Sequence, residues 1–144
     1  MQIDISQGTI EDILVVDAQI PEFAVKTPAE KLAGRLMGRV HLLLVAKDNG
    51  KPVGYKLGYA LSESEFYSWH GAILPTYRKQ GIATRLRETQ EEWVRKNGFK
   101  TISVKSMNLF PAMLQLLISS GYKISGYIDE GDPSNSKILF SKRL

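Results

Sequence analysis

The residues best suited to chemistry form one short run in the middle of the chain. Arg78, Lys79 and Gln80 precede Gly81, and Ile82 begins a stretch with helical periodicity. The free N–H groups in the first turn of a helix carry partial positive charge and bind phosphate oxygens. The two cations add full charge, and a glycine, which has no β-carbon, lets the backbone approach a ligand closely. This run therefore predicts an anion site suited to a phosphate or pyrophosphate.

Two further arginines follow one turn later in the expected helix. Arg85 and Arg87 are spaced to meet an additional phosphate. The sequence contains neither a Gly-x-x-x-x-Gly-Lys-Ser/Thr loop nor a Gly-x-Gly-x-x-Gly fingerprint, so the two common phosphate motifs do not apply. On Gly81 alone, a packing glycine beside solvated surface cations is the simpler interpretation, and only the wider pattern around it is specific.

The residue counts exclude several kinds of chemistry. The chain has no cysteine, which rules out disulfides, thiolate nucleophiles and cysteine zinc sites. Its two histidines, His41 and His70, are too few for a histidine metal site without several carboxylates, so we expect no metal. The net charge of +4 suits anionic ligands, but it is small for binding along a nucleic-acid backbone. Because the aromatic residues are not interleaved with basic ones, we expect no nucleic-acid partner.

Hydrophobic periodicity and turn residues predict the elements that position the run. Stretches of strand length cover residues 3–5, 41–47, 53–61, 65–73, 101–104, 122–128 and 137–140. Helical patterns cover residues 10–18, 28–38, 81–97 and 110–119. Thr9 and Thr27 are the expected N-caps of the first two helices. Asn49 and Gly50 predict a hairpin turn, because both residues tolerate positive φ.

This order of elements predicts the fold class. The 144 residues suit one domain, which we expect to span residues 1–144. We expect an α/β (α+β) architecture: a mixed, mainly antiparallel central sheet of about six to seven strands, flanked by about four helices.

The strand expected over residues 65–73 leads into the glycine run and carries candidate proton acceptors. Side chains alternate along a strand, so Glu65, Tyr67 and Trp69 share one face and His70 lies on the other. We expect Gly71 to mark a bulge, as strand glycines often do.

Taken together, these residues resemble the GNAT acetyltransferase superfamily. The run from Arg78 to Ala83 is similar to the family's Arg/Gln-x-x-Gly-x-Gly/Ala acyl-CoA signature, and Ile73-x-Pro75-x-Tyr77 is similar to its Val-x-Pro-x-Tyr lead-in. The similarity covers most of the chain, from the paired N-terminal helices to Asn108 and the Gly121-Tyr122 pair. The resemblance implies a single GNAT-like N-acetyltransferase domain with the fold outlined above.

The resemblance also implies the reaction. The chain would transfer an acetyl group from acetyl-CoA to a primary amine of a small molecule, peptide or protein, as an acyltransferase for groups other than amino-acyl groups. Because no cysteine is present, a cysteinyl acyl-enzyme is impossible, and direct attack in a ternary complex is expected. The residues expected to bind acetyl-CoA are Ala72, Ile73, Leu74, Arg78, Lys79, Gln80, Gly81, Ile82, Ala83, Thr84 and Asn108. A backbone amide near Ile73 is expected to polarise the thioester carbonyl.

Members of this family often use a glutamate on the strand before the signature as the general base. Counting back places that role at Tyr67 or Glu65, and a carboxylate accepts a proton near neutral pH whereas a phenol does not, which favours Glu65. The usual general acid is a tyrosine four residues before Gly121, a position that Leu117 occupies here. No tyrosine lies between Asn108 and Gly121, so solvent is expected to protonate the thiolate.

The missing tyrosine leaves an alternative: a catalytically weak acyl-CoA-binding or sensing module of the same fold. We expect the acceptor pocket to form from the first two helices, the Asn49 turn, the 62–64 loop and the last hairpin. Four residues that could line it, although ordinary packing explains each, are Phe23, Met37, Tyr55 and Tyr59.

The N-terminus carries no basic segment before an apolar one, and the longest apolar run, Leu42 to Ala46, is far too short to span a membrane. We therefore expect a cytoplasmic protein that acts away from membranes. We expect it to be a monomer or a homodimer, paired through the final strands.

Overall fold

A computed structural model of the chain describes residues 1–21, 23 and 26–144. Over these residues the strands are β1 (Ile3–Gln7), β2 (His41–Asp48), β3 (Lys51–Ala60), β4 (Glu65–Ile73), β5 (Thr101–Met107), β6 (Lys123–Ile128) and β7 (Lys137–Arg143). The helices are α1 (Ile10–Asp17), α2 (Ala29–Leu36), the 3₁₀ turn η1 (Pro75–Tyr77), α3 (Ile82–Lys96) and α4 (Pro111–Ser119).

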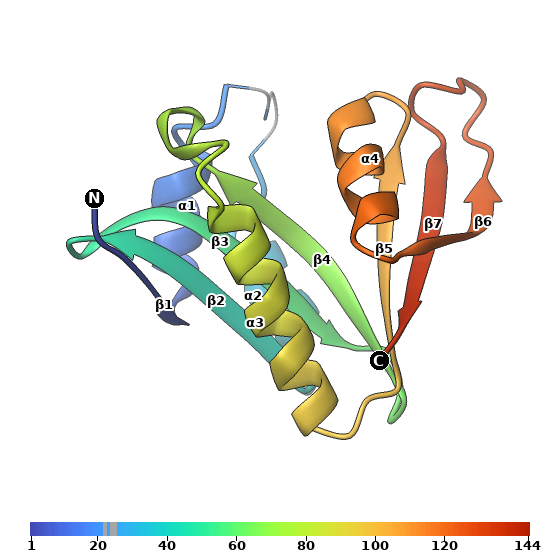
Figure 1. The fold of residues 1–144 in the computed structure, drawn as a ribbon, viewed down its shortest axis with the longest axis horizontal. Helices are drawn as coiled ribbons and strands as arrows, with labels where there is room; N and C mark the ends of the chain where they lie inside the picture. The colour runs from blue at the N-terminus through green and yellow to red at the C-terminus, as the bar shows by residue number, and fades with distance from the viewer. Residues whose placement is uncertain (22, 24–25) are drawn as a thin grey trace.

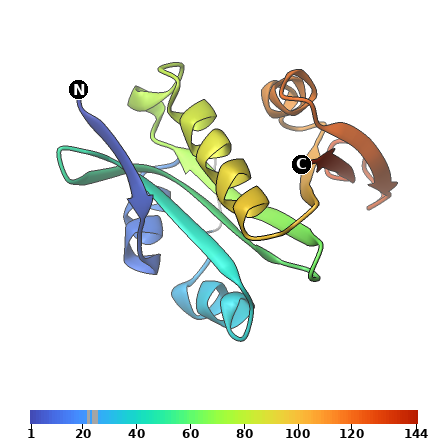
Figure 2. The same ribbon diagram turned by 60° about the horizontal axis from the view of Figure 1, so that its bottom comes forward.

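The strands form one seven-stranded sheet in the order β1-β2-β3-β4-β5-β7-β6. Its pairs are antiparallel except for β4 with β5, which run parallel. The mixed, mainly antiparallel sheet predicted from the sequence is confirmed, and so are the flanking helices. Helix α3 covers one face, while α1 and α2 cover the other (Figure 2). Strand β2 lies beneath both layers, which explains why its run from Leu42 to Ala46 is buried on both faces.

Strands β4 and β5 meet at one end of the sheet and then separate. Their pairing runs from Glu65 with Thr101 to Ser68 with Val104, and no further pair is formed between them in the described residues. Beyond that point the two strands diverge, with α3 beside β4 and α4 beside β5 (Figure 1). We call the space between them the V. From Trp69 onward, no strand of the described residues pairs with the edge of β4 that faces the V.

A bulge in β4 lies at Trp69, and the expectation of a bulge at Gly71 is wrong. The register with β3 passes from Gly58 opposite Ser68 to Leu57 opposite His70, which leaves Trp69 unpaired, while Gly71 stays in register. Gly58 permits this irregularity, because a β-carbon there would lie only 2.6 Å from the Tyr67 carbonyl oxygen.

The bulge also changes which side chains share a face. The extra residue shifts the alternation by one position. His70 therefore lies on the α1–α2 side together with Tyr67, near Asp17 of α1, and its ring centroid is 4.7 Å from that of Trp69. The expectation that His70 faces the opposite side is wrong for this reason.

The helix starts confirm one predicted cap and correct another. Thr9 and Asp12 form a reciprocal capping box at the start of α1. At α2 the N-cap position is Pro28, which adopts an extended conformation, and no side chain in the described part of the chain caps the helix. Thr27 therefore does not act as predicted. Packing of its buried face, which includes Leu32 and Leu36, stabilises this helix instead.

A buried polar cluster connects α3 to the far half of the sheet. Glu91 of α3 accepts hydrogen bonds from Lys142 of β7 at 2.8 Å, Tyr122 at 2.9 Å and Arg87 at 3.2 Å. Burial alone raises the pKa of Glu91, but the hydrogen bonds from Lys142 and Tyr122 outweigh it and lower that pKa. The cluster thus joins the elements on the two sides of the V.

Candidate active site

The predicted anion site lies where η1 ends and α3 begins, at the open end of the V (Figure 1). Gly81 is the N-cap of α3 with φ at +83°, a left-handed conformation that other residues rarely adopt. A β-carbon at Gly81 would meet no atom within 4 Å, so the backbone angle, and not steric crowding by the protein, explains the glycine. The space that this leaves beside the helix end is available to a ligand.

The first turn of α3 presents its N–H groups without a side-chain cap. These donors belong to Ile82, Ala83 and Thr84, and they point out of a helix of 15 residues whose N-terminal end is positive. The Ile82 side chain is only 2% exposed and anchors the helix end in the core. The local geometry is therefore that of an anion-binding helix terminus.

Three hydrogen bonds hold the turn before this helix in place. The Tyr77 hydroxyl donates to an Asp48 carboxylate oxygen at 2.7 Å, which ties η1 to the β2–β3 turn. The Arg78 Nε donates to the Ile73 carbonyl at 3.1 Å, and the Gln80 side chain donates to the backbone of Thr76 at 3.1 Å. The turn is thus formed before any ligand arrives.

The two later arginines do not face this site. Both terminal nitrogens of Arg85 lie 3.3 Å from the Ile3 carbonyl oxygen of β1. Arg87 pairs with Glu91 at 3.2 Å, in the buried cluster. The expectation that these arginines meet an additional phosphate is therefore wrong, because the helix turns them toward the sheet and away from its N-terminal end.

The free edge of β4 presents backbone groups to the V. The Leu74 N–H donates to the Val53 carbonyl at 2.9 Å, so the backbone of Leu74 is directed toward β3. Because backbone groups alternate along a strand, those of Ile73 point to the opposite edge, where Arg78 already reaches the Ile73 carbonyl. Of the predicted residues Ala72, Ile73 and Leu74, Ile73 is the one whose N–H faces the V.

On the α1–α2 side of the sheet, a cavity of about 230 Å³ opens where β4 and β5 begin to separate. Its floor includes Glu65 and Tyr67 of β4 and Ser103 of β5. The Ser103 hydroxyl donates to a Glu65 carboxylate oxygen at 2.9 Å. The lining residues are Arg35, Tyr59, Leu61, Glu65, Tyr67, Ser103, Val104, Lys105, Ser125, Leu139 and Phe140. We call this the acceptor-side cavity.

Three aromatic rings pack together beside this cavity, and two of them, Tyr59 and Tyr67, line it. The Tyr59 ring contacts those of Tyr67 and Trp69 edge-on, at centroid distances of 5.5 Å and 5.7 Å. Burial, aided by Tyr59 and opposed by Arg35, raises the pKa of Tyr67 to about 12, so its hydroxyl remains a donor at neutral pH. Burial lowers the pKa of His70, although Asp17 opposes this, and the shift favours the neutral imidazole.

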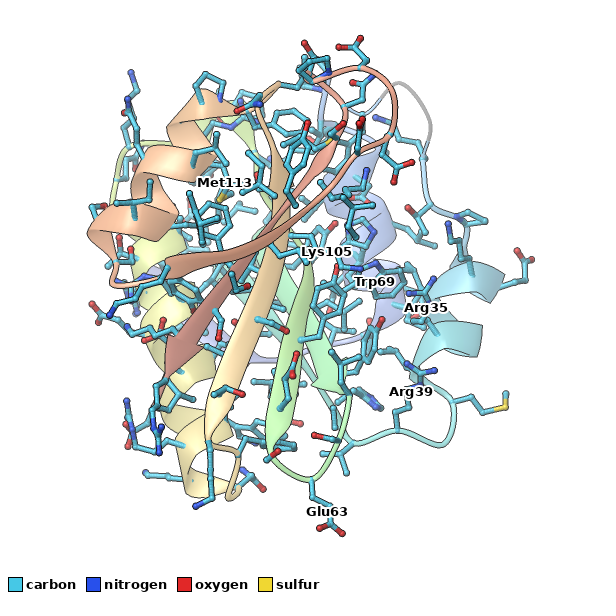
Figure 3. The ribbon with its side chains drawn as sticks, turned by 90° about the vertical axis from the view of Figure 1, so that its right-hand side faces the viewer. Arg35, Arg39, Glu63, Trp69, Lys105 and Met113 are labelled. Atoms are coloured by element: carbon cyan, nitrogen blue, oxygen red, sulfur yellow. The ribbon has the colours of Figure 1, made fainter. Side chains whose placement is uncertain are left out.

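The position of the family's usual tyrosine holds a buried, apolar side chain. Leu117 is 5% exposed in α4, where it carries no proton to donate. Asn108, expected near the pantetheine arm, donates its side-chain amide to the Pro133 carbonyl at 3.2 Å. Met113 of α4 lies on the side of the molecule where the V opens (Figure 3).

The acceptor-side cavity differs in part from the predicted pocket. Of the four residues suggested for it, Tyr59 lines it. Tyr55 is buried and donates to Asp17 at 2.7 Å, Met37 is 79% exposed, and Phe23 packs against the core. The last hairpin contributes as expected, whereas the Asn49 turn does not line the cavity.

Sequence reasoning missed Arg35, Ser103 and Lys105. The parallel register of β5 with β4 places Ser103 opposite Tyr67, and this register is not visible in the sequence. Arg35 reaches the cavity from α2, and only the packing of that helix against the sheet brings it there.

A comparison of sequences assigns the family. The sequence model of the GNAT family of acetyltransferases matches residues 11–114, which is most of the chain. The chain belongs to the GNAT acetyltransferase family. A 57-residue stretch is 44% identical to N-alpha-acetyltransferase 20 of Dictyostelium discoideum, and this match covers 35% of the chain and 32% of that protein. The match thus spans about a third of the relative's length.

Solved structures share the fold of this GNAT domain over nearly its whole length. The ribosomal-protein-S18-alanine N-acetyltransferase from Escherichia coli has a TM-score of 0.84 at 18% identity, covering 99% of this chain and 94% of that one. A GNAT family acetyltransferase from Elizabethkingia anophelis with acetyl-CoA bound has a TM-score of 0.77 at 18% identity, covering 99% and 98%.

None of the helices formed by the described residues is both long and apolar enough to cross a membrane. No group of three or more His, Asp or Glu side chains in this part of the chain is arranged to hold a metal ion.

Proposed function

We propose that this GNAT domain transfers an acetyl group from acetyl-CoA to a primary amine, by direct attack in a ternary complex. One observation carries the proposal: the free edge of β4 leads directly to the uncapped N-terminus of α3, with a separate cavity on the other face of the sheet. A thioester and an amine can thus approach the same strand from opposite faces.

Backbone N–H groups supply most of the proposed contacts with acetyl-CoA, the acetyl donor. The pyrophosphate of acetyl-CoA accepts hydrogen bonds from the N–H groups of Gln80 to Thr84, and Arg78 and Lys79 add charge. The pantetheine arm lies along β4 at Ala72 to Leu74, where the Ile73 N–H faces it and stabilises the developing oxyanion. Asn108 directly follows β5 and donates its side-chain amide to the Pro133 carbonyl, and we propose that it also borders the pantetheine arm.

Glu65 is the proposed general base. Its carboxylate lies in the acceptor-side cavity, oriented by the Ser103 hydroxyl. Glu65 precedes Ile73, whose N–H is proposed to face the thioester, by eight positions, about 26 Å along an extended strand. The proton of the attacking amine is therefore proposed to reach Glu65 through a chain of water molecules. Solvent protonates the departing thiolate, because Leu117 replaces the usual tyrosine.

His70 is a second candidate base, favoured by the bulge at Trp69. The bulge places the imidazole on the same face as Tyr67 and nearer to the free edge of β4. Burial lowers the pKa of His70, so the ring can accept a proton at neutral pH.

The acceptor is proposed to be an N-terminal amine of a peptide or protein. The Dictyostelium relative is named as an N-alpha-acetyltransferase, and the E. coli neighbour is named for an alanine of a ribosomal protein. Both names favour an α-amine over other primary amines.

Release of the CoA thiol in the presence of a panel of amines tests the proposal, together with thermal unfolding with and without CoA. We expect CoA to raise the Tm and at least one amine to accelerate thiol release. Protection by CoA with no amine-dependent release would instead support the binding module.

The base assignment is tested by the pH dependence of kcat/KM for Glu65→Gln and His70→Gln. We expect Glu65→Gln to remove the acidic limb of the profile and His70→Gln to leave it in place. The reverse result would assign the base to His70.

A further inference from the structure

The acceptor-side cavity is more basic than an amine-binding site requires. Two cations, Arg35 and Lys105, line it together with one carboxylate, Glu65. An amine in its protonated form is repelled by the two cations and attracted only by Glu65. A ligand that carries a negative charge as well as the amine would pair with the two cations and with Glu65.

Arg35 is held in one orientation by two contacts. Its Nη1 donates to the Tyr59 hydroxyl at 3.0 Å, and its guanidinium carbon lies 4.8 Å from the centre of the Trp69 ring. Guanidinium groups stack on aromatic faces in this way. The remaining N–H donors of Arg35 can then bind a planar anion such as a carboxylate. No carboxylate among the described residues forms an ion pair with Arg35.

Lys105 approaches the same cavity from β5. Its ammonium lies 5.5 Å from the centre of the Tyr67 ring, and no described carboxylate pairs with it. Arg35, Trp69 and Lys105 lie close together on this side of the molecule, and Glu63 points away from them at the end of the β3–β4 turn (Figure 3). The positive charge of the cavity is therefore not neutralised by that glutamate.

We propose that the acceptor carries a carboxylate close to its reactive amine, and that Arg35 and Lys105 bind this carboxylate in the acceptor-side cavity. The inference rests on the proposed acetyl transfer and specifies the class of its acceptor. A bidentate bond from Arg35 and the charge of Lys105 fix the anionic end, while the amine lies toward Glu65 and the free edge of β4. Polyamines, which add positive charge, are poor acceptors on this basis.

Pairs of acceptors in which a carboxylate is replaced by its neutral amide provide the test. Ala-Asp and Ala-Asn, both with amidated C-termini, compare a peptide carboxylate with its neutral isostere, and alanine and alaninamide make the same comparison for a free amino acid. Each is measured for kcat/KM by thiol release and for affinity by calorimetry in the presence of CoA. We expect the charged member of at least one pair to be favoured tenfold or more, and the pair that responds identifies the source of the carboxylate.

The variants Arg35→Gln and Lys105→Gln are expected to reduce this preference at least fivefold, mainly through KM, with little change in kcat. Lys31→Gln is the matched control, because it removes the same charge from the same exposed helix outside the cavity lining. Thermal unfolding of each variant confirms folding, and Arg35→Lys, which keeps the charge, replaces Arg35→Gln if that variant does not fold.

Three results would overturn the inference. These are equal use and equal binding of the charged and neutral members, a preference that survives in both cavity variants, or the same loss in Lys31→Gln. If amines are acetylated without such a preference, the acetyl-transfer proposal stands and the carboxylate inference fails. If no acceptor is acetylated, the calorimetric comparison still decides the inference, while the acetyl-transfer proposal fails.

Discussion

Two arginines seven positions apart have different environments in this protein. Arg78 lies in the turn before α3 and contacts the Ile73 carbonyl at the edge of the V. Arg85 is bound to the backbone of β1. The direction in which α3 leaves the turn gives the two arginines these different partners.

We predict that Arg78→Ala weakens acetyl-CoA binding at least tenfold, or about 1.4 kcal/mol, because one of the charges beside the N-terminus of α3 is lost. Gly81→Asp is expected to do the same, since it strains a backbone held at φ of +83° and adds negative charge at the anion site. Isothermal titration calorimetry measures both affinities.

Arg85→Ala is the control for this prediction. It removes an equal charge from a residue that is bound to the Ile3 carbonyl, so we expect the acetyl-CoA affinity to change less than twofold. Equal losses in Arg78→Ala and Arg85→Ala would mean that a diffuse positive field, and not the turn, holds the ligand.

At the scale of single elements, the bulge in β4 determines which side chains after Ser68 lie on the α1–α2 side of the sheet. It depends on Gly58 of the neighbouring strand, where an added β-carbon would lie 2.6 Å from the Tyr67 carbonyl oxygen and 2.4 Å from the Phe66 ring. The bulged residue is Trp69, whose ring supports Arg35.

We predict that Gly58→Ala lowers the free energy of unfolding by about 1–3 kcal/mol, because β3 and β4 must move apart to admit the methyl group. Urea denaturation measures this change. Gly34→Ala in α2 is the matched control, since its β-carbon would meet no atom within 4 Å. That variant is expected to gain about 0.5–1 kcal/mol from helix propensity. If Gly58→Ala is as stable as the unmodified protein, the bulge does not depend on this glycine.

At the scale of the whole molecule, the two sides of the V are joined at one end by the β4–β5 pairing and, beneath α3, by the Glu91 cluster. Glu91 is 8% exposed and pairs with Lys142, whereas its neighbour Glu92 is 55% exposed and pairs with Arg95 and Lys96 on the surface. Adjacent glutamates thus have different functions in the same helix.

We predict that Glu91→Gln lowers the unfolding free energy at pH 7 by about 3–5 kcal/mol, because it removes a buried carboxylate from the partly buried Lys142 ammonium. Glu92→Gln is expected to cost less than about 1 kcal/mol. Lys142→Met added to Glu91→Gln should recover part of the loss. Denaturation curves of the four proteins test this, and equal costs for the two glutamates would contradict it.

The pairing of Glu91 with Lys142 makes the stability of the protein depend on pH. The pKa of Glu91 is lower in the folded protein than in the unfolded chain, so its stabilisation is present above the ordinary carboxyl pKa and is lost as pH falls through the folded value. The stability difference between the unmodified protein and Glu91→Gln is therefore expected to shrink as the pH is lowered below about 4.

Much of the fold could be read from local patterns. The strand at residues 65–73, the capping box at Thr9 and Asp12 and the turn at Asn49 and Gly50 are all found where the sequence predicts them, because each depends on neighbours within a few positions. The anion turn with its glycine at positive φ is local in the same sense, and so is the signature that led to the family.

Only the tertiary structure shows how these helices, strands and turns are oriented relative to one another. The sequence indicates alternation in β4, but it does not show that Gly58 of another strand shifts the register at Trp69 and brings His70 to the α1–α2 side. Arg85 and Arg78 look alike until β1 packs beside α3. Arg35, Ser103 and Lys105 are distant in sequence and meet Glu65 only when α2, β4 and β5 are assembled. Short-range geometry fixes the helix ends and turns, whereas strand register and helix packing place the residues around the acceptor-side cavity.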